Sequence, residues 1–432
     1  MANLIEPRIL KGFRDFLPNQ EIPRRDLFER IEAQFRLYGF VPIDTPVLEY
    51  AEILLGKGGG ETEKQIYRFT DSGDRDVAMR FDLTVPFARF VAEHQHQLPL
   101  PFKRYHIAKV WRGENTQRGR YREFTQCDFD IVGSDSPAAD FEILLIMRNT
   151  LQAIGAGDVT IQVNHRGLFN RFLQRLGCAE KSVEILRVVD KLDKIGRDGT
   201  EEALHEFCDA AKARSILEYI ATTGSFEEAL NAAEEAAGGP CPESQRLRLI
   251  WRFMSETDIG HSFAFAPAIT RGLDYYTGIV YESYLNKLPE IGSVCSGGRY
   301  DNLAALYCRD TIPGVGASIG IDRLIAALES LGSIASQEGY AKAIIACIRE
   351  EDSGAYQSLA GRLRAQGIPC EVFTEPKKLS QQFILAEKKG AAWVIIPREN
   401  PREDTFCLRD LASRKDRDPC TLEEAAAIIE GR

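Results

Sequence analysis

Residues 111–133 read WRGENTQRGRYREFTQCDFDIVG, and this stretch decides the fold that we expect for the chain. Its pattern predicts a strand over residues 103–112, a polar loop over 113–119 and a second strand over 120–133, which together form a long antiparallel hairpin. Successive side chains of a strand point to opposite faces, so alternate residues of the second strand share one face. Those residues are Phe124, Gln126, Asp128 and Asp130.

This face combines an aromatic ring, an amide and two carboxylates, and arginines surround the loop beside it. The arginines are Arg112, Arg118, Arg120 and Arg122. Guanidinium groups match phosphate oxygens, carboxylates match an ammonium group or an imidazole N–H, and an aromatic ring can stack on a purine. The pattern therefore suits a ligand with a flat base, a triphosphate and an ammonium group. Alternatively, the hairpin is a solvated surface whose arginines pair with Glu114, Glu123 and Asp128.

Length and composition indicate a globular protein of more than one domain. A chain of 432 residues is too long for one core, and its 44% hydrophobic and 27% charged content is ordinary. The sequence has neither a signal-peptide pattern nor an apolar run of about twenty residues, so we expect a cytoplasmic protein without membrane contact. The net charge of −10 argues against broad nucleic-acid binding and leaves room for a local basic patch.

The ten cysteines form no Cys-x-x-Cys pair, which favours reduced core thiols over a zinc site or a disulfide framework. His94 and His96 have no nearby cysteine to complete a metal site, so we expect no metal bound by the protein itself.

The N-terminal part predicts a helix and an edge strand. Leu27, Ile31 and Phe35 recur every four residues in a helix that should end near Gly39. A strand over 40–50 follows, and its two prolines indicate a sheet border or an interface.

Residues 77–90 alternate like a further strand, with Arg80, Asp82 and Thr84 on one side. Asp82 and Thr84 could hold an ammonium group. Equally, Asp82 could cap the turn before Pro86.

Residues 168–258 are helical in period and interrupt the strands. After them, RGLDYYTGIVYE at 271–282 begins with Arg271 and places Tyr275 and Tyr276 between Gly272 and Gly278, glycines that permit close approach to a ligand. Tyr300 lies in CSGGRYDNL at 295–303.

Residues 314–328, GVGASIGIDRLIAAL, predict a strand that runs into a helix. Arg323 at the helix start is suited to a phosphate, or it pairs with Asp322 or Glu329. From residue 340 onward, strands and helices alternate as in a small α/β domain.

Several of these stretches resemble class II aminoacyl-tRNA synthetases. Residues 111–133 resemble motif 2 in its histidyl-tRNA synthetase version, the first helix and strand with Pro46 resemble motif 1, and residues 314–328 resemble motif 3. KGFRDFLP at 11–18 resembles the N-terminal signature of histidyl-tRNA synthetases, and RGLDYYTGIVYE resembles a motif specific to them.

The resemblance implies an α+β class II catalytic domain, an antiparallel sheet flanked by helices, with a helical insertion and a C-terminal α/β anticodon-binding domain. Residues 1–167 and 259–331 would form the catalytic domain, 168–258 the insertion and 340–432 the anticodon-binding domain. Motif 1 implies a homodimer.

The implied reaction has two steps: histidine and ATP give histidyl-adenylate and pyrophosphate, and the histidyl group then passes to the 3′ end of tRNA(His). Mg²⁺ would arrive with ATP. Residues implied to bind ATP are Arg112, Glu114, Phe124 and Arg323. Residues implied to bind histidine are Asp82, Thr84, Gln126, Asp130, Arg271, Tyr275, Tyr276 and Tyr300, with Arg271, Arg112 and Gln126 serving catalysis.

The loop departs from the family pattern, because many bacterial members carry Glu-Arg-Pro-Gln where this chain has Glu-Asn-Thr-Gln at 114–117. Gln117 and Arg118 are left as candidates to contact the tRNA acceptor end. Two alternatives share the fold: a catalytically silent paralogue acting as regulatory subunit of ATP phosphoribosyltransferase, and a module that senses histidine or uncharged tRNA. Intact motif arginines and an intact 271–282 stretch favour the enzyme.

Overall fold

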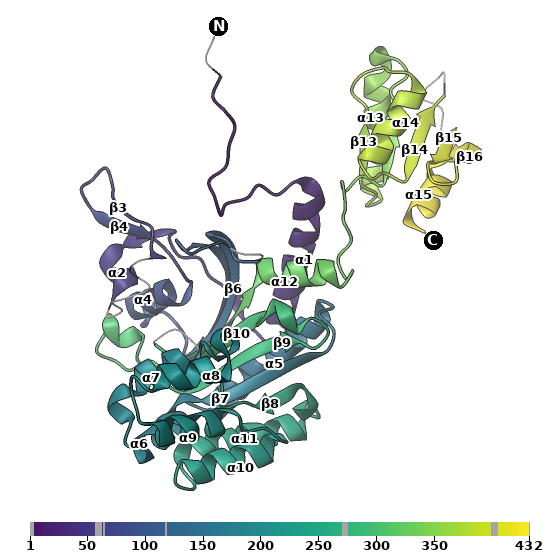
Figure 1. Cartoon of the computed structure of the whole chain (residues 1–432). Coiled ribbons are helices and arrows are strands. Elements are labelled where there is room, and N and C mark those ends of the chain that lie inside the picture. The colour runs from purple at the N-terminus through teal and green to yellow at the C-terminus, as the bar shows by residue number, and fades with distance from the viewer. Residues whose placement is uncertain are drawn as a thin grey trace. The chain divides into compact units, whose positions relative to one another are not determined.

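The computed structural model describes residues 4–56, 63, 65–116, 119–269, 275–398 and 405–431. The chain forms two compact units, shown in Figure 1. The first comprises Met1–Arg14 and Leu27–Ile334, and the second comprises Asp15–Asp26 and Ala335–Arg432. No described helix is long and apolar enough to cross a lipid bilayer.

An eight-stranded sheet is the centre of the first unit. Its order is β1 (Val41–Pro42), β5 (Phe102–Trp111), β6 (Glu123–Val132), β11 (Gly314–Gly320), β10 (Cys295–Tyr300), β9 (Ile279–Leu285), β7 (Val159–His165) and β8 (Phe263–Phe265). The strands from β5 to β7 pair antiparallel, whereas β1 and β8 add parallel strands at the two edges. The predicted α+β fold with a largely antiparallel sheet is confirmed.

The hairpin predicted from residues 103–133 is confirmed as β5 and β6, which pair in continuous register from Phe102 opposite Val132 to Trp111 opposite Glu123. On β6, Phe129 packs into the core, where its ring centroid lies 4.8 Å from that of Phe35. The side chains of Phe124, Gln126, Asp128 and Asp130 on the same strand point to the opposite face of the sheet, where they line a cavity. The two faces follow from the strand alternation.

Helices cover the core face of this sheet. They include the second half of α1 (Pro18–Leu37), which supplies Leu27, Ile31 and Phe35, and α5 (Pro137–Ala153), which Ser136 caps by accepting a hydrogen bond from the Ala138 amide. The helix α12 (Ile321–Ser330) continues directly from β11, as predicted for residues 314–328.

A three-stranded sheet corrects two predictions. It consists of β2 (Leu48–Tyr50), β4 (Asp76–Met79) and β3 (Arg68–Thr70), accompanied by α2 (Ala51–Leu55) and α4 (Thr84–His94). The predicted strand over 40–50 is therefore two short strands in different sheets, β1 and β2, and each is an edge strand, as the prolines of this stretch indicated. The predicted strand over 77–90 ends at Met79, because the Asp82 carboxylate accepts a hydrogen bond from the Val85 amide and starts a helix that Pro86 fits.

Six α-helices follow β7 and gather beside β7 and β8 at one end of the first unit (Figure 1). They are α6 (Arg166–Arg175), α7 (Ser182–Val189), α8 (Leu192–Leu204), α9 (Ala210–Ile220), α10 (Phe226–Ala236) and α11 (Pro242–Glu256). Single-turn 3₁₀ helices occur at Ala179–Lys181, Gly260–Ser262, Pro289–Ile291, Ala304–Leu306 and Glu350–Asp352.

The second unit has its own core around a five-stranded mixed sheet. Its order is β13 (Cys370–Val372), β12 (Ala343–Ile345), β14 (Trp393–Pro397), β15 (Thr405–Asp410) and β16 (Asp416–Thr421). The helices α13 (Ser353–Ala365), α14 (Leu379–Lys388) and α15 (Leu422–Glu430) complete it. The α/β pattern predicted from residue 340 onward is confirmed.

Candidate active site

A cavity of about 260 Å³ lies over β6, β10 and β11. Four of its lining residues are the alternate side chains of β6 singled out from the sequence: Phe124, Gln126, Asp128 and Asp130. The remaining lining residues come from the start of α4 and the turn before it, the loop between β5 and β6, the segments before β9 and β10, strands β10 and β11, and the start of α12. The cavity has an acidic, tyrosine-lined end and a cationic end.

Asp130 is the centre of the acidic end. Its Oδ1 accepts a hydrogen bond of 2.5 Å from the Tyr300 hydroxyl, and its Oδ2 lies 2.7 Å from Nη2 of Arg104 in an ion pair. Burial raises the pKa of Asp130, whereas Arg104 and the Tyr300 hydroxyl oppose the rise by favouring the charged form. Asp130 is thus a buried acceptor held in one orientation.

Three tyrosines surround this end of the cavity. The ring centroids of Tyr275 and Tyr276 are 5.0 Å apart, and those of Tyr275 and Tyr300 are 6.0 Å apart. Burial raises the pKa of all three hydroxyls above the ordinary value, so at neutral pH each remains a hydrogen-bond donor.

Two further carboxylates, Asp82 and Asp128, share the acidic end with Thr84. The Thr84 hydroxyl donates to Oδ2 of Asp128 at 3.4 Å, and Oδ1 of Asp82 accepts the Val85 amide at 3.1 Å. Burial raises the pKa of Asp82 to about 6 and that of Asp128 to about 7, and neighbouring carboxylates add to both shifts. These two carboxyl groups therefore lose their protons at a higher pH than ordinary carboxyl groups, and a cation bound beside them would favour their ionised forms.

Besides Oδ2 of Asp130, which has only its ion pair with Arg104, three buried acceptor atoms at the acidic end have no hydrogen-bond partner within the described part of the chain. They are Oδ2 of Asp82, Oδ1 of Asp128 and Oε1 of Gln126. The amide nitrogen of Gln126 is held by Ser318 Oγ at 2.9 Å, which leaves the amide oxygen toward the cavity. Because buried polar atoms are ordinarily hydrogen-bonded, these acceptors indicate a ligand with several donors.

Glycines on β10 and β11 leave room for the acidic side chains. Gly316 lies directly opposite Asp130 in the β11–β6 register, and a β-carbon at Gly316 would lie 1.9 Å from Oδ1 of Asp130. A β-carbon at Gly314 would likewise lie 2.4 Å from the Tyr300 ring. Only glycine at these positions allows the two side chains to occupy the cavity.

Arginines line the opposite end of the cavity. Arg112 donates from Nε to the Phe81 carbonyl at 2.9 Å, and its guanidinium carbon lies 5.1 Å from the ring centroid of Phe124. Arg120 forms an ion pair of 3.2 Å with Glu114, and Arg323 donates from Nη1 to the Ser293 carbonyl at 2.5 Å. The arrangement offers positive charge beside an aromatic face, which suits a nucleotide phosphate and base.

Asp322, which the sequence offered as a partner of Arg323, contacts Arg14 and the backbone of Thr125. Its Oδ1 pairs with Arg14 at 2.5 Å, and its Oδ2 accepts the Thr125 amide at 2.8 Å. It thereby joins the N-terminal segment to β6 and to the start of α12.

The cavity brings together most of the residues that the sequence singled out. They are Asp82, Thr84, Arg112, Glu114, Phe124, Gln126, Asp130, Tyr275, Tyr276, Tyr300 and Arg323. Three others, Gln117, Arg118 and Arg271, lie outside the described residues. The alternative of a wholly solvated hairpin is wrong, because Asp128 and Asp130 are each only 2% exposed, although the predicted pairing of an arginine with Glu114 does occur.

The sequence placed Asp128 on the expected ligand-binding face without a role of its own, and it pointed to neither Arg104 nor the packing of Gly316 against Asp130. The alternation of side chains along β6 already placed Asp128 on the same face as Gln126 and Asp130. The contacts of Arg104 and Gly316 with Asp130 could be recognised only once the pairing of β6 with β5 and β11 was known, because that pairing places both residues directly opposite Asp130.

Comparisons with known proteins show the family of the chain. Residues 12–324 match the histidyl-tRNA synthetase family. A histidine–tRNA ligase from Treponema denticola is 51% identical over 444 aligned positions that cover 99% of each chain, and one from Rhodopirellula baltica is 45% identical over 99% of this chain and 98% of its own. The crystal structure of a histidyl-tRNA synthetase from a Nostoc species has a TM-score of 0.85 and 29% identity over 99% of this chain and all of its own. The chain therefore belongs to the histidyl-tRNA synthetase family.

Proposed function

We propose that the cavity activates histidine with ATP and that the chain then transfers histidine to the 3′ end of tRNA(His). The observation that carries the proposal is the set of three unpartnered buried acceptors beside Asp130, at one end of a cavity whose other end carries arginines. Full-length relatives that are histidine–tRNA ligases support it, and no finding favours a regulatory subunit of ATP phosphoribosyltransferase.

Histidine would occupy the acidic end. Asp82, Thr84 and Gln126 would hold the α-ammonium group, since Asp82 and Gln126 contribute unpartnered acceptors. Asp130 and Tyr276 would bind the two imidazole nitrogens, while Tyr275 and Tyr300 would close the cavity around the ring. An amino acid without an imidazole N–H would not supply this further hydrogen bond to a buried carboxylate, which disfavours the wrong substrate.

ATP would occupy the cationic end. Arg112 would bind the α-phosphate, Phe124 would stack on the adenine, Glu114 would lie on the adenine side, and Arg323 would hold the far side of the nucleotide. Among the described residues, no three His, Cys, Asp or Glu side chains are grouped so that they could hold a metal ion. Mg²⁺ would therefore be bound mainly through the phosphates, the common mode for this ion.

The first step needs alignment and charge stabilisation more than proton transfer. A carboxylate oxygen of histidine attacks the α-phosphorus, the bond to the bridging oxygen of pyrophosphate breaks, and pyrophosphate leaves with the electron pair. Arg271 would neutralise the histidine carboxylate and the α-phosphate, where negative charge is concentrated. Arg112 and Gln126 would hold the two reactants in line.

The second step requires tRNA, for which Gln117 and Arg118 are the proposed contacts with the acceptor end. Residues 340–432 would bind the anticodon, and residues 168–258 would form the insertion of a catalytic domain made of 1–167 and 259–331. We place the enzyme in the cytoplasm as a homodimer.

Charging of tRNA tests the complete proposal. Purified protein incubated with ATP, Mg²⁺, labelled histidine and a tRNA(His) transcript should yield acid-precipitable histidyl-tRNA, whereas another tRNA transcript should not be charged. Absence of charging with tRNA(His) would contradict the transfer step.

A further inference from the structure

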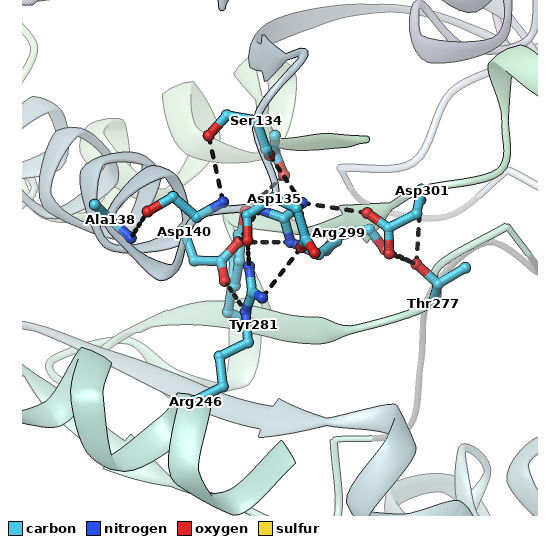
Figure 2. A network of polar contacts seen from close by, with 11 residues as sticks. Ser134, Asp135, Ala138, Asp140, Arg246, Thr277, Tyr281, Arg299 and Asp301 are labelled. Atoms are coloured by element: carbon cyan, nitrogen blue, oxygen red, sulfur yellow. Dashed lines mark hydrogen bonds and ion pairs between the residues drawn. The ribbon is translucent and has the colours of Figure 1, made fainter. Parts of the chain in front are cut away.

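A buried network of charges lies behind the cavity and is centred on Asp140 of α5 (Figure 2). Oδ1 of Asp140 accepts hydrogen bonds from Nε and Nη2 of Arg299 at 2.9 and 2.6 Å. Oδ2 accepts a hydrogen bond of 2.6 Å from Nε of Arg246 on α11. Asp140 is 0% exposed, so one buried carboxylate joins a strand of the sheet to a helix of the segment that follows β7.

Arg299 extends this network to the segment that carries Tyr276. Its Nη1 donates to the Ser134 carbonyl at 3.1 Å and to Oδ1 of Asp301 at 3.2 Å. Oδ2 of Asp301 accepts a hydrogen bond of 2.6 Å from the Thr277 hydroxyl, and the Thr277 amide donates to the Arg299 carbonyl at 2.8 Å. Residue 277 is thereby tied to β10 through both its backbone and its side chain.

Two members of the network, Arg299 and Thr277, are sequence neighbours of residues whose side chains line the cavity. Arg299 and Tyr300 are consecutive on β10, so their side chains point to opposite faces of the sheet. Tyr300 lines the cavity, while Arg299 is turned toward α5. Thr277 directly follows Tyr276, whose side chain also lines the cavity.

Close packing leaves this segment little freedom. A β-carbon at Gly278 would lie 3.1 Å from Cδ of Arg299, and one at Gly298 would lie 2.8 Å from the Tyr276 ring. The Tyr276 carbonyl accepts a further hydrogen bond of 2.8 Å from Arg166. Because Gly298, the neighbour of Arg299, packs against the Tyr276 ring, a shift of Arg299 would displace that ring.

Stability alone is a weak reason for such a network, because buried ion pairs often contribute little compared with well-packed apolar residues. Fixed geometry is a better reason, since removal of one partner leaves another buried and unsatisfied. Side chains that contact a substrate gain precision when neighbouring hydrogen bonds fix their backbone.

We propose that Asp140, acting through Arg299, Asp301 and Thr277, is a positioning residue that sets Tyr276 and Tyr300 in the histidine end of the cavity. Through Arg246 the same carboxylate ties this geometry to α11. The inference deepens the proposed function and rests on it, because it concerns affinity for histidine. It assigns no direct substrate contact to any member of the network.

Thr277→Val tests the link at a partly exposed residue, since valine keeps the shape of threonine and removes only the hydroxyl. In histidine-dependent exchange of pyrophosphate into ATP, the KM for histidine should rise roughly three- to tenfold, because the variant loses the hydrogen bonds of the hydroxyl with the Asp301 carboxylate and amide. The KM for ATP should stay within about twofold of wild type, because the network lies behind the histidine end. Thr277→Ser, which retains the hydroxyl, should restore the wild-type KM for histidine.

Thr160→Val is the matched control. Thr160 on β7 also donates a side-chain hydrogen bond, to Asn286 at 2.8 Å, and neither residue lines the cavity. This variant should have wild-type KM values. Asp140→Asn, if it folds, should raise the KM for histidine more than Thr277→Val does.

An unchanged KM for histidine in Thr277→Val would overturn the positioning role, and so would an equal rise in the KM values for histidine and ATP. In either case, wild-type exchange would leave the proposed function intact. Absence of exchange in the wild-type protein would instead contradict the proposed function itself.

Discussion

Arg104 and Asp130 face each other across the β5–β6 pair, with Nη2 of the arginine 2.7 Å from Oδ2 of the carboxylate. Arg104 is 0% exposed, and its guanidinium carbon lies 4.1 Å from the ring centroid of Phe87, which closes its other side. A buried cation thus favours the ionised form of a carboxylate whose pKa burial raises. In the proposed function, this pair would prepare Asp130 to accept a hydrogen bond from an imidazole.

Asp130→Asn should weaken histidine binding by about ten- to hundredfold, the range for a hydrogen bond to a charged partner. The amide would lose the charge that receives the imidazole N–H while it keeps the shape of the cavity. Calorimetric titration with histidine measures the loss, and titration with ATP should give the wild-type affinity. Wild-type histidine affinity would mean that the imidazole binds elsewhere.

Gly316→Ala should reduce histidine affinity by about tenfold or more, because the new methyl group would collide with the Asp130 carboxylate and displace its hydrogen bonds. Gly361→Ala in α13 is the matched control, since a β-carbon there meets no atom within 4 Å. The control should bind histidine normally. Equal histidine affinity for the two variants would contradict the packing of Asp130 against β11.

Histidine affinity should rise as the pH increases from about 6 to about 8. Burial raises the pKa of Asp82 to about 6 and that of Asp128 to about 7, and an ammonium group binds best when both are ionised. In Asp128→Asn, the rise in histidine affinity near pH 7 should disappear. The rise due to deprotonation of the imidazole of free histidine, whose pKa is about 6.5, should remain. An identical profile in the variant would mean that ionisation of Asp128 does not affect histidine binding.

The stability of the empty protein should change in the opposite direction. A carboxyl group whose pKa is raised on folding binds its proton more tightly in the folded chain, so it contributes stability at low pH. That contribution is lost as the pH rises through the folded value. Thermal unfolding without ligand should therefore lose stability from these groups between about pH 4 and 7. Added histidine should raise Tm more at pH 8 than at pH 6, and a larger rise at pH 6 would contradict this assignment.

Arg271→Ala should lower the rate of adenylate formation by about a hundredfold or more, the usual cost of removing a group that stabilises charge in the transition state. Single-turnover measurement of adenylate formation isolates this step from tRNA transfer. The affinity for ATP alone should change little. A wild-type rate would remove Arg271 from the proposed mechanism.

Much of the fold could be predicted because periodicity is local. The β5–β6 hairpin, the alternation of Phe124, Gln126, Asp128 and Asp130, and the passage from β11 into α12 all follow from neighbouring residues. The strand expected through Thr84 was wrong for the same reason: alternation from Met79 to Thr84 resembles a strand, whereas the Asp82 cap and Pro86 begin a helix.

Contacts between distant segments could not be predicted from local pattern. Arg104 and Gly316 meet Asp130 only because three strands pair in one register. Asp140 and Arg299 are 159 positions apart, and their connection depends on α5 packing behind β10. Charged residues are mostly found on solvated surfaces. The burial of these ones is determined by the tertiary fold, so it cannot be predicted from the residues next to them in sequence.

Histidine-dependent exchange between ATP and labelled pyrophosphate tests the central claim most directly, namely that a cationic nucleotide site adjoins a cavity shaped for one imidazole. With purified protein and Mg²⁺, histidine should support rapid exchange, while each of the other nineteen standard amino acids should give only background. Background exchange with histidine, or comparable exchange with glutamine or tyrosine, would contradict the account.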